Sequence, residues 1–327
     1  MDLETRNDQH EPETRRSSTL TRWVCLALVL PARVLAQQPD ASVVRQSLDD
    51  AWWTGPILAN SVATLPRGHI LIEPYIYDVV SANASSFGSL TYMLYGLTDR
   101  FTVGLVPTAG LTKPNAGTSS SGIELGDASI LGQYRLTQFR EGHWLPTMSL
   151  QVQETLPTGR YDQLGSRPSN GLGGGDFSTT LALNTQAYLW ARTGRIARMR
   201  LNVSETVSTS ARVAGVSVYG TTEAFKGSAN PGKAFFADIA WEYSLTRKWV
   251  LALDLTYRHS GRTFVTGSSG GSPLTFNLSS NEILAVVPAI EYNWRSYVGV
   301  IVGTRLIPAR HNSAATVTPV LAINFVH

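Results

Sequence analysis

The sequence predicts an all-β fold: a closed, antiparallel, up-and-down transmembrane β-barrel of about 12 strands. Three observations predict it. Segments of about ten residues alternate between apolar and polar side chains, which is typical of strands with two unlike faces. The links between these segments alternate between short and long. Charged residues make up only 16% of the 327-residue chain, well below the ~25% of ordinary soluble domains.

Composition excludes several other classes of protein. The net charge of +3 comes without a long run of lysine or arginine, so the chain lacks the basic footprint of a nucleic-acid-binding protein. A single cysteine excludes a disulfide framework and any zinc or iron–sulfur site with several cysteine ligands. The mean hydropathy of −0.04 excludes a bundle of membrane-spanning helices. It does allow a membrane barrel, in which only alternate residues need to be apolar.

The start of the chain has the features of an export signal. Three arginines between positions 15 and 22 precede the apolar run 23–30, and the small residues of 34–36 fit a signal-peptidase site. The apolar run is too short to span a membrane, which needs about 20 residues. We therefore predict that residues 1–36 are a signal peptide, cleaved after Ala36.

The segment 37–67 precedes the first expected strand. The pair Trp52 and Trp53, followed by Pro56, makes it too apolar to hang free in water. We expect it either to fold back as a plug in the barrel lumen or to dock at the periplasmic mouth. The barrel itself is expected to span residues 68–327.

The clearest strand is 249–258. Its odd-numbered positions are all apolar or aromatic, and its even-numbered positions are small or polar, so one face suits lipid and the other suits a wet interior. The same alternation predicts strands at 70–77, 90–95, 101–105, 127–136, 148–153, 181–189, 199–204, 235–243, 249–258, 284–292, 298–306 and 321–325.

The links between strands fall into two classes. Every second link is short, and the alternate links are long and rich in glycine, serine, proline and asparagine, at 108–122, 158–176, 208–231 and 260–280. In an up-and-down meander the two classes lie at opposite ends, which matches the short periplasmic turns and long outer loops of outer-membrane barrels. We therefore expect both termini in the periplasm.

Membrane chemistry favours the same fold. An exported chain without a spanning helix can pair all its backbone groups within lipid only as a closed barrel, which also removes exposed sheet edges. Aromatic residues expected on the outward face collect near strand ends, as an interfacial girdle requires: Tyr92, Tyr134, Trp241, Tyr243, Trp249, Tyr257 and Tyr292. The expected location is the bacterial outer membrane.

Strand parity also predicts which residues line the lumen. The charged candidates carry both signs, and the acidic ones gather on neighbouring strands: Glu73, Asp127, Arg135, Arg200, Asp238, Glu242, Asp254, Arg258, Glu291 and Arg305. One interpretation is a polar constriction that orients a passing solute. The other is a set of ion pairs that brace the wall. The tyrosines expected inside (Tyr75, Tyr77, Tyr95 and Tyr188) would stack on an aromatic solute or fill space.

Four motifs in the same order resemble the MetA-pathway phenol-degradation family. They are WWTGPIL at 52–58 continuing through LPRGH at 65–69 to IEPY at 72–75, YGLTDRF at 95–101, GD at 126–127 with QYR at 133–135, and LPTG at 156–159. Members of that family are outer-membrane barrel proteins, often called transporters. The resemblance implies transport linked to the breakdown of aromatic compounds, without fixing a ligand or its binding residues. One departure is the chain end at 325–327, since barrel proteins usually end on an aromatic residue that the assembly machinery reads.

The expected function is uptake of small, aromatic or hydrophobic molecules. The expected partners are that solute, outer-membrane lipid and the barrel assembly machinery, with no cofactor, no metal and no nucleic acid. The alternative is a structural or adhesin-like barrel with a closed lumen. An enzyme is not expected, because His311 and Ser313 lack a third catalytic partner and the glycine-rich run 171–175 leads into a strand rather than a phosphate-binding helix.

Overall fold

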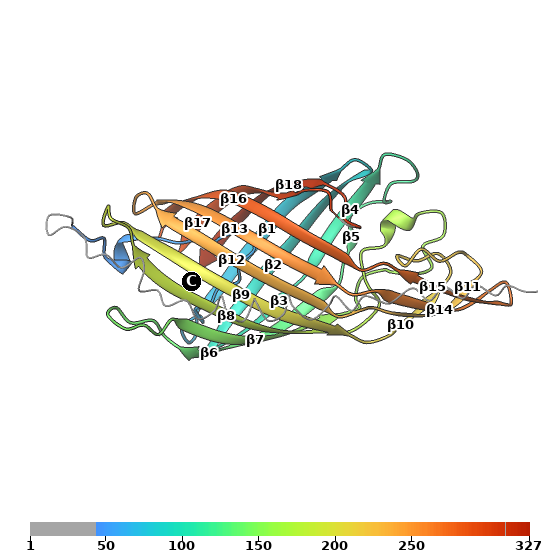
Figure 1. Ribbon diagram of the computed structural model, residues 1–327, viewed down its shortest axis with the longest axis horizontal. Coiled ribbons are helices and arrows are strands. Elements are labelled where there is room, and N and C mark those ends of the chain that lie inside the picture. Colours follow the sequence, from blue (N-terminus) through green and yellow to red (C-terminus); the bar gives the residue numbers. More distant parts are fainter. Residues whose placement is uncertain (1–43, 311) are drawn as a thin grey trace, which may run out of the picture. The chain divides into compact units, whose positions relative to one another are not determined.

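The computed structural model describes residues 44–310 and 312–327. The expected signal peptide 1–36, with its cleavage site after Ala36, and His311 lie outside the described residues. Within them the chain forms a closed, antiparallel barrel of 12 strands (Figure 1). Two short 3-10 helices, η3 (Leu48–Asp50) and η4 (Pro168–Asn170), lie outside the wall. No helix among the described residues is long and apolar enough to cross a membrane.

Each predicted strand range overlaps one strand of the observed wall, which confirms the predicted meander. The wall consists of β1 (Ile70–Ser81), β2 (Ala84–Thr98), β3 (Phe101–Val106) continued by β4 (Thr108–Pro114), β5 (Glu124–Leu125) leading into β6 (Ala128–Thr137), β7 (Thr147–Leu156), β8 (Ser178–Trp190), β9 (Ile196–Ser208), β12 (Ala234–Ser244), β13 (Trp249–Ser260), β16 (Asn281–Arg295), β17 (Val298–Ile307) and β18 (Thr316–Val326). The barrel closes because β1 pairs with both β2 and β18.

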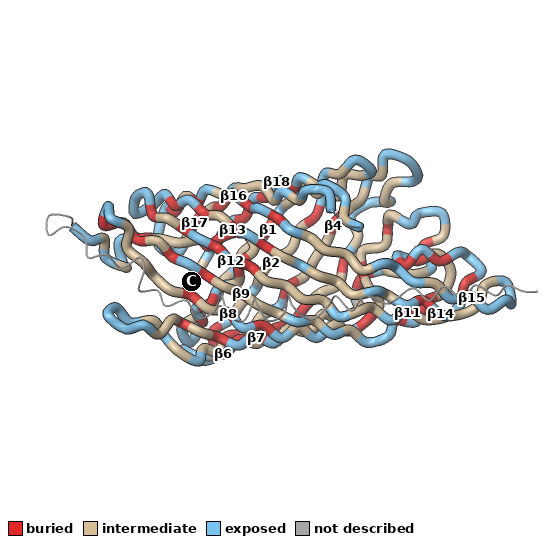
Figure 2. Tube along the Cα trace, in the orientation of Figure 1, coloured by how far each residue is buried: buried red, intermediate tan, exposed pale blue. Residues whose placement is uncertain are grey.

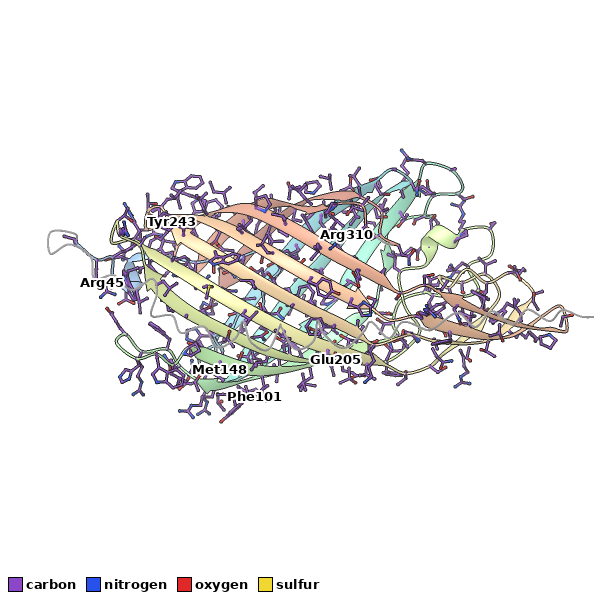
Figure 3. All side chains as sticks on the ribbon, in the orientation of Figure 1. Arg45, Phe101, Met148, Glu205, Tyr243 and Arg310 are labelled. Atoms are coloured by element: carbon purple, nitrogen blue, oxygen red, sulfur yellow. The ribbon has the colours of Figure 1, made fainter. Side chains whose placement is uncertain are left out.

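The short turns and the long links lie at opposite ends of the barrel, as the sequence predicts. Figure 1 shows η3 and the C-terminus at the end with the short turns, which we call the short-turn end. In Figure 3 Arg45 and Tyr243 lie at that end, whereas Glu205 and Arg310 lie toward the other, the long-loop end. The chain therefore enters and leaves the barrel at the short-turn end.

Side chains alternate between the two faces of the wall. On β13 the exposed Trp249, Leu251 and Leu255 alternate with the buried Ala252 and Asp254, and Figure 2 shows the same alternation along other wall strands. An exposed apolar band around a closed barrel is stable only in lipid, and this is the construction of multi-pass barrels of the bacterial outer membrane.

Three of the expected long links are partly strands, and in the first of them, 108–122, β4 continues the barrel wall. Residues within 208–231 and 260–280 form β10 (Ala211–Ala214), β11 (Phe225–Asn230), β14 (Thr263–Ser269) and β15 (Ser272–Leu278), which pair as a separate four-stranded sheet beyond the long-loop end. Phe225, Ala229 and Val265 are fully buried in its own small core. The expectation of loops was wrong here because these strands are rich in glycine and serine and show no apolar alternation. Strands pair through backbone hydrogen bonds, which do not require that alternation.

Candidate functional site: the barrel lumen

The segment before β1 first contacts the rim of the short-turn end. The backbone N–H of Gln46 donates to the carbonyl of Gly194 at 2.9 Å, and that of Trp52 donates to the carbonyl of Arg247 at 3.0 Å. The Arg247 guanidinium lies 5.0 Å from the centre of the Trp52 ring and 3.5 Å from Asp50. Residues 44–52 are therefore held against two of the short turns.

Residues 53–67, which we call the inserted segment, continue into the lumen. Glu291 Oε2 accepts from the backbone N–H of Thr54 at 2.7 Å and of Gly55 at 3.3 Å. Deeper inside, the Asp254 carboxylate accepts from three successive N–H groups, those of residues 57–59, at 3.2, 3.3 and 3.0 Å. Bonds to a charged acceptor are stronger than neutral ones, so these two carboxylates are the main anchors of the segment.

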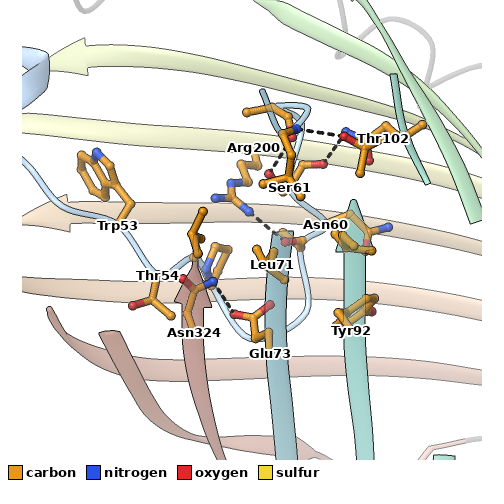
Figure 4. Close-up of a pocket in the computed structure, with 18 of the residues that line it drawn as sticks. Trp53, Thr54, Asn60, Ser61, Leu71, Glu73, Tyr92, Thr102, Arg200 and Asn324 are labelled. Atoms are coloured by element: carbon orange, nitrogen blue, oxygen red, sulfur yellow. Dashed lines mark hydrogen bonds between the residues drawn. The ribbon is translucent and has the colours of Figure 1, made fainter. Parts of the chain in front are cut away.

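The inserted segment then returns to the end at which it entered. Arg200 Nη1 donates to the carbonyl of Ala59 at 3.0 Å, and Gln133 Nε2 donates to that of Ser61 at 3.0 Å. The N–H of Leu65 donates to Thr102 Oγ1 at 2.8 Å. The segment is thus a loop with its turn in the middle of the barrel, and polar wall residues bind its backbone on both arms (Figure 4).

A buried ion-pair cluster lies beside the entering arm. The Arg198 guanidinium binds both oxygens of Glu242, with Nε to Oε2 at 2.5 Å, and Arg200 Nε lies 3.5 Å from the same Oε2. All three side chains are almost completely buried. The Trp53 ring covers Arg198 at 4.6 Å. Here the bracing interpretation fits, because each buried charge faces an opposite one.

The lumen on the far side of the turn is different. Asp238 is fully buried, and neither of its oxygens has a hydrogen-bond partner among the described residues. Its register partner on β13 is Thr256, one inward position closer to the long-loop end than Asp254. Arg258 and Arg305 follow on the inward face in the same direction, and Nε of Arg305 is also without a partner within the described chain. This half of the lumen therefore contains polar groups that nothing in the described residues satisfies.

Around its circumference the lumen has an apolar cluster in one region and many hydroxyl and amide groups in another, and charged side chains occur in both. On β16–β18, β1 and β2 an apolar cluster includes Val287, Ile301, Tyr75 and the inserted Ile57, with Tyr75 and Tyr92 edge to face at 5.9 Å. On β6–β9 many of the inward groups, besides Leu131, Arg198 and Arg200, are hydroxyls and amides that bond across strands. These pairs are Ser129 with Thr155 at 2.9 Å, Thr180 with Thr206 at 2.7 Å, and Asn202 with Asn184 at 2.7 Å.

A cavity of about 230 Å³ lies between the inserted segment and the wall. It includes Trp53, Tyr92, Gln133 and Arg200, together with Glu73, whose Oε1 accepts from Asn324 Nδ2 at 3.2 Å (Figure 4). For scale, an engineered cavity of about 150 Å³ binds benzene. The space is therefore large enough for a molecule with one aromatic ring, and its walls offer both apolar surface and hydrogen bonds.

The structure brings together most of the predicted lumen residues. Those around the inserted segment and the lumen beyond it are Glu73, Tyr75, Arg200, Asp238, Glu242, Asp254, Arg258, Glu291 and Arg305. Two others lie at the ends. At the long-loop end, the Asp127 carboxylate accepts hydrogen bonds from the backbone N–H of Gly159 at 2.8 Å and of Gly174 at 2.7 Å. Arg135 lies at the short-turn rim.

The parity predicted for β2 is wrong. Tyr95 pairs with the outward Ile70 and is 42% exposed on the outer face, not in the lumen. Tyr92, expected in the outer girdle, lines the cavity instead. The reason is that β2 is apolar on both faces: its inward residues pack in the lumen's apolar cluster, so alternation cannot tell its two faces apart.

Three of the functional residues were missed. Arg198 precedes Arg200 by two positions, so extending the strand would have found it. Gln133 and Asn324 have inward parity on the predicted strands 127–136 and 321–325, but parity does not show which groups they bind. The backbone N–H groups of 54–59 have no sequence signal at all, since every residue except proline carries one.

Comparisons with known proteins agree on the fold. No family model and no curated protein sequence matches the chain. Among solved structures, an outer membrane channel from Pseudomonas putida F1 is similar with a TM-score of 0.63 and 14% identity, covering 83% of this chain and 100% of that chain. The NanC porin gives 0.44 and 7%, covering 78% and 98%. A deletion mutant of the TodX monoaromatic hydrocarbon channel gives 0.45 and 13%, covering 88% and 97%. At these identities, the similarity to the first protein shows that the chain has the fold of an outer-membrane channel.

Proposed function

We propose that the chain is an outer-membrane channel for the uptake of small, aromatic or hydrophobic molecules, with the inserted segment as its plug. The observation that carries this proposal is a lumen that combines an apolar cluster around Tyr75, Val287 and Ile301 with a region rich in hydroxyls and amides on β6–β9. A phenol-like solute combines the same two kinds of surface, an apolar ring with a polar substituent. The four motifs that resemble the phenol-degradation family support the same class of solute.

The charges of the lumen support a channel for neutral molecules. The charge of Glu242 is balanced by two arginines. Asp254 and Glu291 accept hydrogen bonds from backbone N–H groups of the inserted segment. Beyond the plug, Asp238 faces a region that also contains Arg258 and Arg305. A mixed lining of this kind does not favour one sign of ion strongly.

The plug is held in a way that allows release. Its anchors are hydrogen bonds from the backbone of residues 54–59 to two wall carboxylates, without a covalent link. Water or a polar solute can replace such bonds, because they are hydrogen bonds that exchange with those of water. The cavity beside the plug includes Leu71, Ser296 and Val326 near the short turns, so a solute arriving from the long-loop end would reach it, and then the periplasm, only when the turn of the plug moves.

Planar-bilayer recording and liposome swelling test the proposal. Deletion of residues 40–66 from the full chain should raise single-channel conductance several-fold, because it empties the half of the lumen near the short turns. Wild-type protein in liposomes should admit phenol faster than a sugar of similar size. Unchanged conductance after the deletion would rule out the plug, and equal swelling rates would rule out the solute class.

A closed-lumen structural or adhesin-like barrel is the second candidate. The observation that favours it is the separate outer sheet of β10, β11, β14 and β15, whose own core gives the long-loop end a firm surface. The same recordings distinguish the two, since a structural barrel would give no conductance steps even after the deletion.

A further inference from the structure

A second cavity lies at the short-turn rim. Its volume is about 340 Å³, and it is formed by the β6–β7 turn and the β2–β3 turn. Its basic residues are Arg100, Arg135, Arg140 and His143, and its apolar residues include Leu136. Three guanidinium groups and an imidazole therefore face one small space.

These arginines have no acidic partner. Among residues 44–310 and 312–327, none of the three guanidinium groups makes an ion pair or a side-chain hydrogen bond. Of the two acids next to these arginines in sequence, Glu141 is bound to Arg45 at 3.0 Å, and Asp99 accepts from the backbone N–H of Arg67 at 3.0 Å. Arg100 and Arg140 are exposed to solvent, and like charges around one pocket repel one another, so a negatively charged ligand would relieve their repulsion.

Hydrogen bonds and packing hold the two turns that carry these arginines next to each other. The N–H of Arg135 donates to the carbonyl of Arg100 at 2.9 Å, which fixes the two turns side by side. A bulge after Arg135 and a bond from Thr137 Oγ1 to the carbonyl of Pro146 at 2.7 Å shape the β6–β7 turn. Phe139 anchors the same turn by packing edge-on against the inward Tyr188 at 5.4 Å. The fold of the rim therefore fixes the positions of the two turns that form the pocket.

The pocket also lies at the edge of the lipid-facing band. Leu136, which lines it, is 44% exposed, and the neighbouring Tyr134 and Trp144 are 47% and 91% exposed. Tyr134 belongs to the aromatic girdle, and such girdles mark the depth of lipid headgroups. A basic pocket at this depth meets the phosphate of a phospholipid, with acyl chains alongside Leu136 and Tyr134.

We propose that this pocket binds a phosphate group through Arg100, Arg135 and Arg140, and that the phosphate belongs to a phospholipid of the periplasmic leaflet. Arginine suits this ligand because its planar guanidinium donates two parallel hydrogen bonds to phosphate oxygens. A soluble phosphate has the same chemistry but lacks acyl chains, so the two sources can be told apart.

Native mass spectrometry of the full-length protein in detergent tests the site. Short-chain phosphatidylglycerol and inorganic phosphate are titrated separately into the wild type, into the double variant Arg100→Gln/Arg140→Gln, and into a control, Lys248→Gln/Arg295→Gln, which removes two cations from other short turns. We expect the double variant to weaken lipid binding about 25-fold, roughly fivefold for each guanidinium, and the control to bind as the wild type does.

The outcomes separate the possible sources. Loss of lipid binding without measurable phosphate binding supports the phospholipid. Equal loss for lipid and inorganic phosphate supports a phosphate site with a soluble ligand and overturns the lipid assignment. Lipid affinity that is the same in the wild type and the double variant overturns the site. If the double variant does not fold, Arg140→Gln alone carries the test, with about a fivefold loss expected.

Discussion

The two halves of the lumen satisfy their buried charges in different ways. Toward the short turns, Asp254 and Glu291 accept hydrogen bonds from the inserted segment. Two residues nearer the long loops in register, Asp238 is equally buried but has no bonded oxygen within the described chain. A buried polar atom without a partner costs about 1–3 kcal/mol. The first half therefore binds a piece of the protein, although Glu291 Oε1 and Arg200 Nε lack a hydrogen bond there, and the second leaves both oxygens of Asp238 for water or a solute to complete.

This difference explains why charge alone does not identify the solute path. Asp254 and Asp238 have the same chemistry, the same inward parity and neighbouring places on paired strands. What separates them is whether the chain brings backbone donors to them. The experiments below alter one half or the other and ask whether the two respond separately.

The largest effect is expected at the ion-pair cluster of the plugged half. Glu242→Ala leaves Arg198 and Arg200 buried without their shared carboxylate. Removing one partner of a buried ion pair costs about 3–5 kcal/mol, so the free energy of unfolding in detergent should fall by that amount. Urea unfolding followed by tryptophan fluorescence measures it. The control Glu205→Ala removes an exposed glutamate and should cost under about 0.5 kcal/mol; a similarly small loss for Glu242→Ala would contradict the bracing role.

The next effect compares the two aspartates directly. Asp254→Asn removes the charge that binds three backbone N–H groups of the plug. Because bonds to charged groups contribute about 1.5–3 kcal/mol, the population of open channels in single-channel recordings should rise at least about tenfold. Asp238→Asn has the same change of charge but touches no plug residue, so its open population should change less than about twofold. Equal responses would show that the two halves do not differ as described.

A backbone contact gives a third, smaller effect. The inward face of Gly96 touches the returning arm of the plug, where an added Cβ would meet the Pro66 carbonyl oxygen and lie 2.7 Å from that of Leu65. Gly96→Ala should therefore displace this arm and lower the unfolding free energy by about 1–3 kcal/mol, with a rise in conductance. At Gly132 the added Cβ would meet only the Phe101 ring, at 3.4 Å, so Gly132→Ala should leave conductance unchanged. If both variants behave alike, the contact does not hold the plug.

Much of the fold could be predicted because lipid on one side and water on the other impose strict alternation. The strand 249–258 and the alternation of short and long links could therefore be predicted from the sequence. The first half of β2, Ala84 to Ser89, was not, because it is rich in serine and glycine and pairs through its backbone. The strands of the outer sheet were hidden in the same way. Hydrogen-bonded pairing stabilises such segments without leaving an apolar pattern.

The site was predictable to the level of residue type and face. Parity brought Asp254, Glu291 and Glu242 to the inward side, and the neighbouring strands brought them near one another. What each carboxylate binds depends on the inserted segment, which enters the lumen and returns. The donors of that segment are backbone N–H groups, which carry no sequence signal. Parity also fails where both faces of a strand are apolar. For this reason Tyr95, expected in the lumen, lies on the outer face, and Tyr92, expected on the outer face, lies in the lumen.

The smallest effect is expected outside the membrane, among the long loops at the long-loop end. Tyr219 Oη donates to the carbonyl of Gly174 at 2.5 Å. Burial, with Asp176 and Asp127 nearby, raises the pKa of Tyr219 above its ordinary value. A raised pKa means that the neutral phenol stabilises the folded loops at every pH below about 10, and that this contribution is lost as the phenolate forms at higher pH.

Tyr219→Phe should accordingly loosen the loops by about 1 kcal/mol without opening the plug. Limited proteolysis of the long loops at pH 7 should proceed about fivefold faster in the variant, while single-channel conductance stays at the wild-type level. Above about pH 10 the wild type should lose its protection, whereas the variant, which has no phenol at 219 to ionise, should change less. Tyr297→Phe, at an exposed tyrosine of the opposite end, is the matched control. A change in conductance with Tyr219→Phe would mean that the loops and the plug are coupled, and that the two halves of the lumen open as one unit.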